Sequence, residues 1–547
     1  MDSLRVFAAI IFAVSIFLLL DAWGQDSRPP APAVTSEEGA VPAAPNLELP
    51  VAGTARPEAS APAEARAAAG RIIRVRTDYL EADIDTRGGV IKRLELLQHR
   101  ATIDKSQTFQ LFDDGRQHTY LAQSGLIGAG LPNHTTLYTA EREQYLLEDG
   151  QDRLVVALQA TGVEGAQVVK RLVFERSSYV IQAGYEVRNT GAQPIASHAY
   201  FQLLRDGEAP EGDSSMLPTY TGAAVYTDAS KFKKVSFEDI AKGKTDYPKQ
   251  ADNGWVAMVQ HYFLAAWLPG SGTAREFYTR AVGQNLYAVG VIVPVAEIAP
   301  GASATVATDL YAGPQEQDKL SRLAPGLELT VDYGWLTIIA APLFWVLQWI
   351  YRYVDNWGIA IVLLTVLIKL IFYPLSAASY KSMAKMRVVA PKLQKLKELY
   401  GDDRQRMQQA MLEMYKTEKI NPLGGCLPIL VQIPVFIALY WVLLASVELR
   451  HAPFMLWIDD LSAKDPYYVL PVLMGLSMIV QTWLNPTPPD PVQAKVMKIM
   501  PVVFSIFFFF FPAGLVLYWL GHDLRSIAQQ WQITRVIERS KPANGAR

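Results

Sequence analysis

Lys369 is the residue of this sequence whose type and position most clearly point to a chemical role. It lies within Ile359–Leu375, a segment that is otherwise almost wholly apolar and has the composition of a membrane-spanning helix. A charged side chain at the centre of a bilayer costs roughly 2.5–3.5 kcal/mol. A membrane protein that keeps such a charge therefore gives it water, a partner or a function. The alternative is that Lys369 only extends its ammonium group to the nearer headgroups.

Composition excludes several classes of function. The 547 residues carry a net charge of −2, which provides no general basic field for nucleic acid. The one cysteine, Cys426, excludes an internal disulfide and a cysteine-based metal cluster. The sequence has no H-E-x-x-H, no phosphate-binding P-loop and no G-x-G-x-x-G fingerprint. We therefore expect no cofactor, no metal and no enzymatic reaction.

The N-terminal part of the chain is expected to be exported. Residues 1–24 are apolar enough to form an N-terminal transmembrane anchor, although Ala22-Trp23-Gly24 also fits a signal-peptide cleavage site. Residues 25–70 are rich in Pro, Ala and Glu and predict a disordered linker, because they cannot form a core. Residues 71–325 contain short runs of β-forming residues separated by turn signals such as Asp149-Gly150, which predicts a large β-sandwich.

The distribution of basic residues predicts the topology of the remaining chain. Residues 376–421 form a short, strongly basic segment, which places it in the cytoplasm. Its basic residues are Lys381, Lys385, Arg387, Lys392, Lys395, Lys397, Arg404, Arg406, Lys416 and Lys419. Only one span can then separate it from an exported domain, and we assign that span to residues 357–375. The apolar and aromatic residues 333–354 are instead expected to form an amphipathic helix in the outer interface.

The other segments follow by alternation across the membrane. We expect transmembrane helices at 422–446, 467–484, 499–511 and 515–533, a periplasmic loop at 447–466, a cytoplasmic loop at 485–498 and a cytoplasmic tail at 534–547.

Under this topology, the cytoplasmic half of every span is polar and the outer half is apolar. The inner-half residues are Thr365, Lys369, Gln432, Ser477, Gln481, Lys498, Ser505, His522, Asp523, Arg525, Ser526, Gln529 and Gln530. This predicts a shared hydrated cavity that opens inward and is sealed outward by Phe507–Phe511, Tyr518 and Trp519. The span 499–511 has 13 residues, about 20 Å of helix against a hydrocarbon core of about 30 Å, which indicates a locally thinned bilayer.

The basic segment has a pattern of its own. Methionines recur at helical spacing after an expected helix cap at Asp402 or Asp403, which predicts two amphipathic helices hinged at Tyr400-Gly401. The methionines are Met383, Met386, Met407, Met411 and Met414. They either pack the hairpin or offer a pliable surface to apolar clients. The basic face can meet anionic headgroups or ribosomal RNA.

With these motifs, the chain resembles the YidC/Oxa1/Alb3 family of membrane protein insertases in its long Gram-negative form. The resemblance covers essentially the full length. The motifs that carry it are Asp332-Tyr333-Gly334-Trp335, Asn356-Trp357-Gly358, Tyr373-Pro374-Leu375, Asn421-Pro422-Leu423-Gly424-Gly425-Cys426, Ser446-Val447-Glu448-Leu449-Arg450 and Gly514-Leu515-Val516-Leu517-Tyr518.

The resemblance implies a multi-domain protein of the bacterial inner membrane. A periplasmic all-β supersandwich would join an α-helical membrane bundle of an N-terminal anchor and five core transmembrane helices. It implies insertion and folding of nascent membrane proteins through a hydrophilic groove open to the cytoplasm. It also implies as partners the nascent clients, the Sec translocon (SecYEG and SecDF), the ribosome, components of the signal recognition particle, and membrane lipids.

The groove is expected to be built from Lys369, Thr365, Gln432, Ser505, Tyr518, Trp519 and Asp523. The family usually has Arg where this chain has Lys369, and Gly521-His522-Asp523 replaces residues that are uncharged in relatives. Asp523 is thereby expected within reach of Lys369, with pairing left open.

Two other functions remain to be compared with insertion. The first is an intramembrane hydrolase that pairs Ser477 or Ser505 with Lys369. The second is carbohydrate binding by the β-sandwich, which rests only on the mutarotase-like fold that the resemblance implies.

Overall fold

The computed structural model describes residues 70–115, 118–160, 163–210, 219–283, 285–400, 403–418, 427–485 and 491–539. The expected anchor at 1–24 and nearly all of the expected linker at 25–70 lie outside these residues. The described chain divides into two compact units at Asp332 and Tyr333, a β-rich unit and a helical unit.

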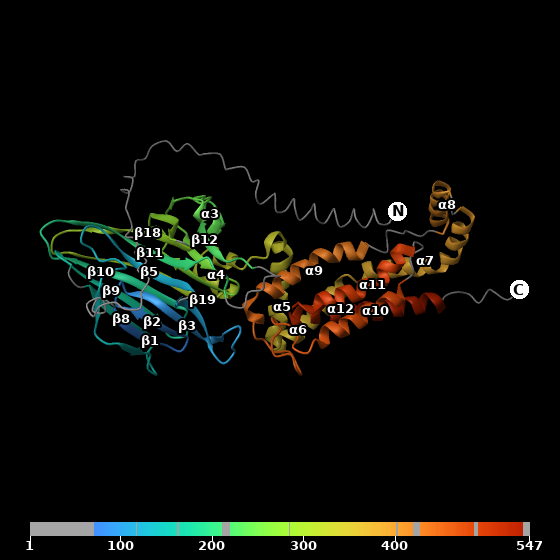
Figure 1. Ribbon diagram of the computed structural model, residues 1–547, viewed down its shortest axis with the longest axis horizontal. Coiled ribbons are helices and arrows are strands. Elements are labelled where there is room, and N and C mark those ends of the chain that lie inside the picture. The colour runs from blue at the N-terminus through green and yellow to red at the C-terminus, as the bar shows by residue number, and fades with distance from the viewer. Residues whose placement is uncertain are drawn as a thin grey trace, which may run out of the picture. The chain divides into compact units, whose positions relative to one another are not determined.

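The β-rich unit consists of two large sheets (Figure 1). Its strands are β1 (Ile72–Arg76), β2 (Leu80–Asp85), β3 (Val90–Arg100), β4 (Thr108–Asp114), β5 (Thr119–Ile127), β6 (Tyr138–Ala140), β7 (Gln144–Leu146), β8 (Arg153–Ala160), β9 (Ala166–Glu175), β10 (Val180–Asn189), β11 (Ile195–Asp206), β12 (Gly222–Thr227), β13 (Lys231–Val235), β14 (Gln250–Ala251), β15 (Trp255–Val259), β16 (Phe263–Leu268), β17 (Arg275–Gly283), β18 (Leu286–Ile298) and β19 (Ser303–Pro314). Short helices α3 (Phe237–Ala241), α4 (Gln317–Leu323) and η1 (Leu327–Thr330) complete it.

One sheet has the strand order β14-β17-β18-β11-β5-β4-β3-β2-β1-β7, and the other has β13-β12-β15-β16-β19-β10-β9-β8-β6. Strands such as β9 alternate buried and exposed residues, as expected when one face packs on a second sheet. Aromatic side chains such as Phe201 and Trp267, with ring centroids 5.1 Å apart, fill the core. The predicted large β-sandwich is therefore confirmed.

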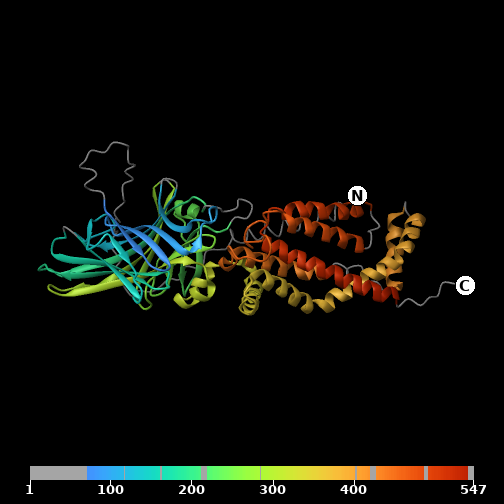
Figure 2. The ribbon, with the colours of Figure 1, turned by 90° about the horizontal axis from the view of Figure 1, so that it is seen from below.

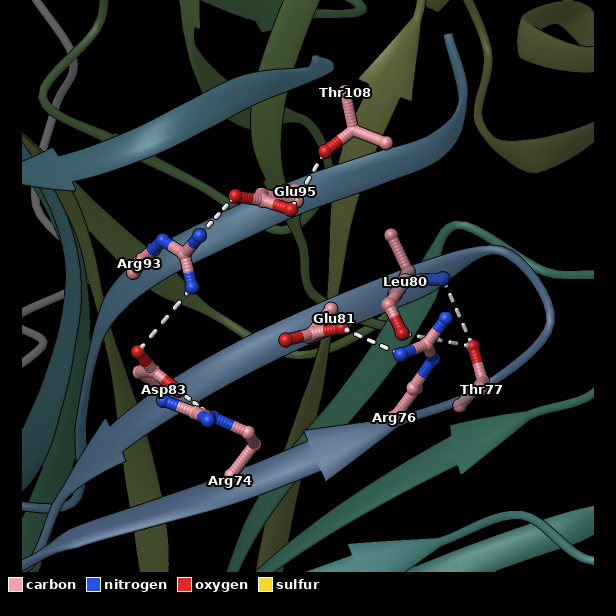
Figure 3. Close-up of polar contacts among 9 residues, drawn as sticks. All are labelled: Arg74, Arg76, Thr77, Leu80, Glu81, Asp83, Arg93, Glu95 and Thr108. Carbon is pink, nitrogen blue, oxygen red and sulfur yellow. Dashed lines mark hydrogen bonds and ion pairs between the residues drawn. The ribbon is translucent and has the colours of Figure 1, made fainter. Parts of the chain in front are cut away.

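Opposite charges alternate on neighbouring strands β1, β2 and β3 (Figure 3). Arg74 Nε lies 3.2 Å from Asp83 Oδ1, and Arg93 Nη1 lies 3.6 Å from the other oxygen of that carboxylate. The strand register places Arg74 opposite Asp83 and Asp83 opposite Arg93. Exposed pairs of this kind contribute little stability each, but they are consistent with the observed register.

The helical unit contains η2 (Gly334–Leu336), α5 (Thr337–Val354), α6 (Trp357–Ile371), α7 (Tyr373–Tyr400), α8 (Arg404–Thr417), α9 (Leu427–Ala445), η4 (Val447–Leu449), α10 (Val469–Leu484), α11 (Pro491–Phe508) and α12 (Ala513–Arg539). In both ribbon views, the α7–α8 hairpin lies at the end of this unit opposite to α5 (Figures 1 and 2).

Helix α6 ends earlier than the expected span 357–375. Its N-terminus is capped by Asn356, whose side chain accepts a 2.9 Å hydrogen bond from the Ile359 N–H. It ends at Ile371, and the axis then bends by 67° into α7. Pro374 explains the break, because its ring clashes with the carbonyl group four residues earlier and it lacks an N–H group. Lys369 consequently lies in the last turn of α6.

Helices α11 and α12 also differ from the expected boundaries. Helix α11 begins at Pro491, inside the segment expected as the loop 485–498, and ends at Phe508 rather than at 511. Proline is favourable at the first position of a helix, which explains the early start. Helix α12 continues to Arg539, six residues beyond the expected end of the span.

Among the described residues, the segment Gly334–Val354 is long and apolar enough to cross a membrane, and α6 with the start of α7 qualifies if the bent pair is one span. The apolar segments 431–445 and 469–484 are shorter.

Candidate functional site

Polar side chains of α6, α9, α10 and α12 lie together in the helical unit, and we call them the polar cluster. Within it, the ammonium group of Lys369 joins α6 to α12. Lys369 is only 8% exposed, and its Nζ donates a 2.7 Å hydrogen bond to Ser526 Oγ on α12. Ser526 Oγ in turn donates to the carbonyl oxygen of His522 at 2.9 Å. The hydroxyl group therefore accepts from the ammonium group while its own proton stays within α12.

Helix α12 contacts α6, α9 and α10 through polar side chains. The side chains of His522 and Gln432 join α12 to α9. On the side of α10, Gln530 Nε2 donates to the carbonyl oxygen of Leu484 at 3.0 Å. On the side of α6, Arg525 Nη2 donates to the Val362 carbonyl oxygen at 3.2 Å. The cluster is thus organised around α12.

Asp523 lies in this cluster without an ion pair to Lys369. Its side chain is 4% exposed, and Ser477 Oγ lies 3.4 Å from Oδ2. His522 Nδ1 lies 3.7 Å from Oδ1. Within the described residues, no nitrogen–oxygen contact of 4.0 Å or less joins Lys369 to Asp523. The pairing that the sequence left open is therefore replaced by the hydroxyl group of Ser526.

An aromatic layer adjoins the polar cluster one turn earlier on α12. The ring of Trp519 lies 4.3 Å from that of Phe436 on α9 and 5.1 Å from that of Phe508 on α11, between ring centroids. Tyr518 is 1% exposed, and its hydroxyl group has no hydrogen-bond partner among the described residues. Polar and aromatic layers therefore follow one another along α12.

Two of the expected groove residues, Ser505 and Thr365, form hydrogen bonds to backbone oxygens away from Lys369. Ser505 Oγ donates to the carbonyl oxygen of Pro471 at 3.1 Å and so joins α11 to α10. Thr365 is 1% exposed and donates to the carbonyl oxygen of Ile361, one turn earlier in its own helix, at 2.6 Å. Both hydroxyl groups are satisfied by backbone oxygens and, within the described part of the chain, neither is hydrogen-bonded to Lys369.

The helical hairpin α7–α8 has local contacts that hold it together. Asp403 caps α8, because its side chain accepts a 3.0 Å hydrogen bond from the Arg406 N–H. Lys392 Nζ on α7 lies 2.5 Å from Glu418 Oε1 just beyond α8. The five methionines of the hairpin are half-buried.

Two family models match the chain over nearly all of the described residues. The model described as the YidC periplasmic domain matches residues 72–346, and the model described as the 60Kd inner membrane protein matches residues 349–541. The chain belongs to the YidC family of membrane protein insertases.

Named relatives agree with the family models. The membrane protein insertase YidC of Aromatoleum aromaticum is 56% identical over 99% of both chains. The insertase of Methylobacillus flagellatus is also 56% identical, over 99% of this chain and 98% of its own length. Among solved structures, an active YidC insertase crystal structure matches with 19% identity and a TM-score of 0.39, over 84% of this chain and 94% of that chain.

Membership of the YidC family favours insertion over the two alternatives considered from the sequence. The proposed serine–lysine hydrolase required Ser477 or Ser505 beside Lys369, whereas the hydroxyl group at hydrogen-bond distance belongs to Ser526. Relatives matched over the full length are named insertases, so carbohydrate binding by the β-sandwich is not favoured.

The expected set of groove residues omitted Ser526 and His522. A signal for both was present in the sequence, because they lie four residues apart and therefore on one face of a helix. That face also carries Gln529 and Gln530.

Proposed function

We propose that this insertase receives hydrophilic client segments at the polar cluster around Lys369, in the cytoplasmic half of the helical unit. The client's apolar segment would then leave sideways into lipid. The single observation that carries the proposal is the hydrogen bond between Lys369 and Ser526, since the acceptor that this buried cation meets among the described residues is a neutral hydroxyl group.

The electrostatic argument starts from that neutral acceptor. A hydroxyl group satisfies one donor of the ammonium group but carries no negative charge itself, and the buried carboxylate of Asp523 lies in the same cluster without a direct ion pair to Lys369. Arg525 nearby donates to the backbone oxygens of Gly521 and Val362, which are also uncharged. A client carboxylate entering the cluster would therefore gain a charge-assisted hydrogen bond. The membrane potential acts in the same direction on acidic client segments.

The aromatic layer supports closure towards the periplasm. Trp519, Phe436 and Phe508 pack together beside the polar cluster. A polar segment that reaches this layer would have to leave water, which opposes its passage. The buried hydroxyl group of Tyr518 offers a hydrogen bond to a client at the boundary between the two layers.

The topology predicted from charge is part of the proposal. Residues 1–24 would anchor the chain, the β-sandwich would be periplasmic, and α7–α8 would be cytoplasmic. The segment Gly334–Val354 is long enough to span a membrane, but we assign it to the outer interface. Its exposed side chains include Trp345 at 67% and Tyr353 at 74%, residue types enriched at that depth.

The remaining partners are assigned by chemistry. The half-buried Met407, Met411 and Met414 of α8, with Met383 and Met386 of α7, would make the first contact with apolar clients. The basic residues of this hairpin would bind ribosomal RNA or anionic headgroups. The β-sandwich would bind translocon partners.

The test is insertion of a single-span client with an acidic translocated segment, measured for Lys369→Arg, Lys369→Ala and Lys369→Glu. Arg should retain insertion, Ala should reduce it and Glu should reduce it most, because the charge is inverted. Equal insertion by the Glu and Lys proteins would refute the electrostatic role. Crosslinks from Tyr518 and Met411 to nascent chains would test the path of the client.

A further inference from the structure

The loop between α9 and α10 buries two of its acidic side chains and exposes two of its large apolar ones. Asp460 is 8% exposed and Asp465 is 2% exposed, whereas Met455 is 50% and Leu456 is 82% exposed. A loop that faces water would show the opposite arrangement, because buried carboxylates are rare and exposed side chains are mostly polar. The loop therefore presents the apolar side chains of Met455 and Leu456 at its surface, although its composition is acidic.

The buried carboxylates build the loop. Asp465 accepts hydrogen bonds from Trp457 Nε1 at 3.0 Å and from the Leu470 N–H at 2.7 Å. Asp460 Oδ1 accepts from the N–H groups of His451 at 3.1 Å and Ser462 at 3.0 Å. Both acids thus fix the backbone on either side of the tip formed by Met455 and Leu456.

The tip itself has an unfavourable backbone conformation. Leu456 has a φ of +57°, in the left-handed region that costs free energy for a residue with a Cβ. The turn is closed by a 2.9 Å hydrogen bond from the Phe454 N–H to the carbonyl oxygen of Ile458. The turn therefore holds Leu456 in an unfavourable backbone conformation while its side chain stays exposed. This combination indicates that a partner outside the helical unit covers the side chain.

The loop is attached to the end of α6 that follows α5. The Phe454 carbonyl oxygen accepts a 2.9 Å hydrogen bond from Asn356 Nδ2, the residue that caps α6. An added Cβ at Gly358 would overlap the ring of Phe454, so loop and helix are in close contact. The tip therefore lies at the level at which α6 begins.

The surroundings favour lipid as the covering partner. The residues that follow the loop are also exposed and apolar or aromatic: Tyr467 is 71% and Tyr468 is 43% exposed, and Val472 and Leu476 of α10 are 49% and 55% exposed. Tyrosines at such a boundary are typical of the interface between headgroups and acyl chains. Lys464 reaches over the ring of Phe510 with its ammonium group 5.5 Å from the centroid, as amphipathic cations do at a membrane surface.

We propose that Met455 and Leu456 form a wedge that inserts into the acyl chains at the end of the bundle where α6 begins. The wedge fixes the loop in the bilayer, about 5–10 Å below the headgroup boundary as for other interfacial apolar elements. Only the assignment to the periplasmic leaflet rests on the proposed function. The contact with lipid does not depend on where clients bind.

The test uses the full-length chain with Cys426→Ser, in which Leu456→Cys or Met455→Cys is labelled with a bimane fluorophore. The labelled protein is placed without any partner in nanodiscs of phosphatidylethanolamine and phosphatidylglycerol. Asp459→Cys is the matched control, because Asp459 is an exposed residue of the same loop. Quenching is measured with iodide from the water and with nitroxide groups on the lipid acyl chains.

We expect nitroxide lipids to quench the labels at 455 and 456 several-fold more strongly than the label at 459, and iodide to show the reverse order. Equal access of iodide to 456 and 459 would overturn the wedge and would leave a protein partner as the cover of this surface. The insertion assay with Lys369 variants is independent of this result, so failure of the wedge and failure of the proposed function are distinguishable.

Discussion

Lys369 Nζ and Ser526 Oγ lie 2.7 Å apart, although 157 residues separate them along the chain. This contact joins the last turn of α6 to the middle of α12. It gives a buried cation a neutral acceptor in a protein that also holds a buried carboxylate, Asp523, within the same cluster. The fold therefore orients the ammonium group of Lys369 through a neutral acceptor, while Asp523 lies in the same cluster without a direct ion pair to it.

Ser526→Ala should remove the acceptor that orients Lys369. We expect a loss of about 1–3 kcal/mol in the free energy of unfolding, because a hydrogen bond to a charged group is lost inside the bundle. Insertion of an acidic client should fall less than in Lys369→Ala, since the charge remains. Thermal unfolding in detergent and the insertion assay measure the two effects. Ser526→Thr keeps the hydroxyl group and should behave like the original, and a loss as large as that of Ser526→Ala would contradict the interpretation.

Gly358→Ala should destabilise the helical unit even though alanine is the better helix former. The new methyl group would meet the ring of Phe454, and overpacking of this kind typically costs about 1–3 kcal/mol. In the background of Phe454→Ala the ring is gone and only the contact with the Cβ of residue 454 remains, so the same substitution should cost clearly less there. Thermal unfolding followed by far-ultraviolet circular dichroism gives both values. An equal cost in both backgrounds would show that the ring of Phe454 does not restrict Gly358.

Much of the fold was predictable from local sequence signals. The short runs of β-forming residues in the sequence, among them Leu154–Leu158, Val168–Phe174 and Tyr179–Val187, correspond to strands such as β8, β9 and β10, because alternating apolar residues between turn signals define strands locally. The break after Ile371 was also visible in the sequence as Pro374, but a hydropathy criterion for a span does not weigh a single proline.

The side-chain partners were harder to predict. The sequence places Lys369 and Asp523 on spans with polar inner halves, and opposite charges invite the expectation of an ion pair. Which group an ammonium meets depends on the rotation of α12, and that rotation presents Ser526 instead. Similarly, the number of acidic residues between α9 and α10 does not reveal that the side chains of Asp460 and Asp465 are buried. Composition does not determine whether a side chain points to the interior or to the surface.

Asp403→Ala should loosen the start of α8. The carboxylate accepts a hydrogen bond from the Arg406 N–H, and removal of such a cap typically costs about 1 kcal/mol of helix stability. Backbone hydrogen exchange of the first turn of α8 should therefore become faster by several-fold, while exchange in α9 stays unchanged. Asp403→Asn is the control, because asparagine caps helices about as well. Unchanged hydrogen exchange in the alanine variant would show that the Asp403 cap does not stabilise the start of α8.

The β-sandwich contains a buried lysine whose environment differs from that of Lys369. Lys170 on β9 is 2% exposed, and its Nζ donates to the carbonyl oxygens of Gly88 at 3.0 Å and Gly89 at 2.8 Å. Burial lowers the pKa of Lys170 from 10.5 to about 7. The two carbonyl oxygens belong to the tight turn between β2 and β3, so this amine holds the turn against the second sheet.

Stability of the β-sandwich should therefore depend on the protonation of Lys170. Between pH 7 and 10.5 the unfolded chain binds a proton at this site that the folded chain does not, so stability rises with pH across that window. The full effect is on the order of 5 kcal/mol. Lys170→Met lacks the titrating group, so the stability of the variant minus that of the original should be most positive near pH 7 and shrink towards pH 10. Urea-dependent protease resistance of the β-sandwich in the full-length proteins measures this difference, in which the titration of all other groups cancels. A difference that stays constant with pH would mean that Lys170 keeps its proton throughout, with the Gly88 and Gly89 carbonyl oxygens solvating a permanent charge.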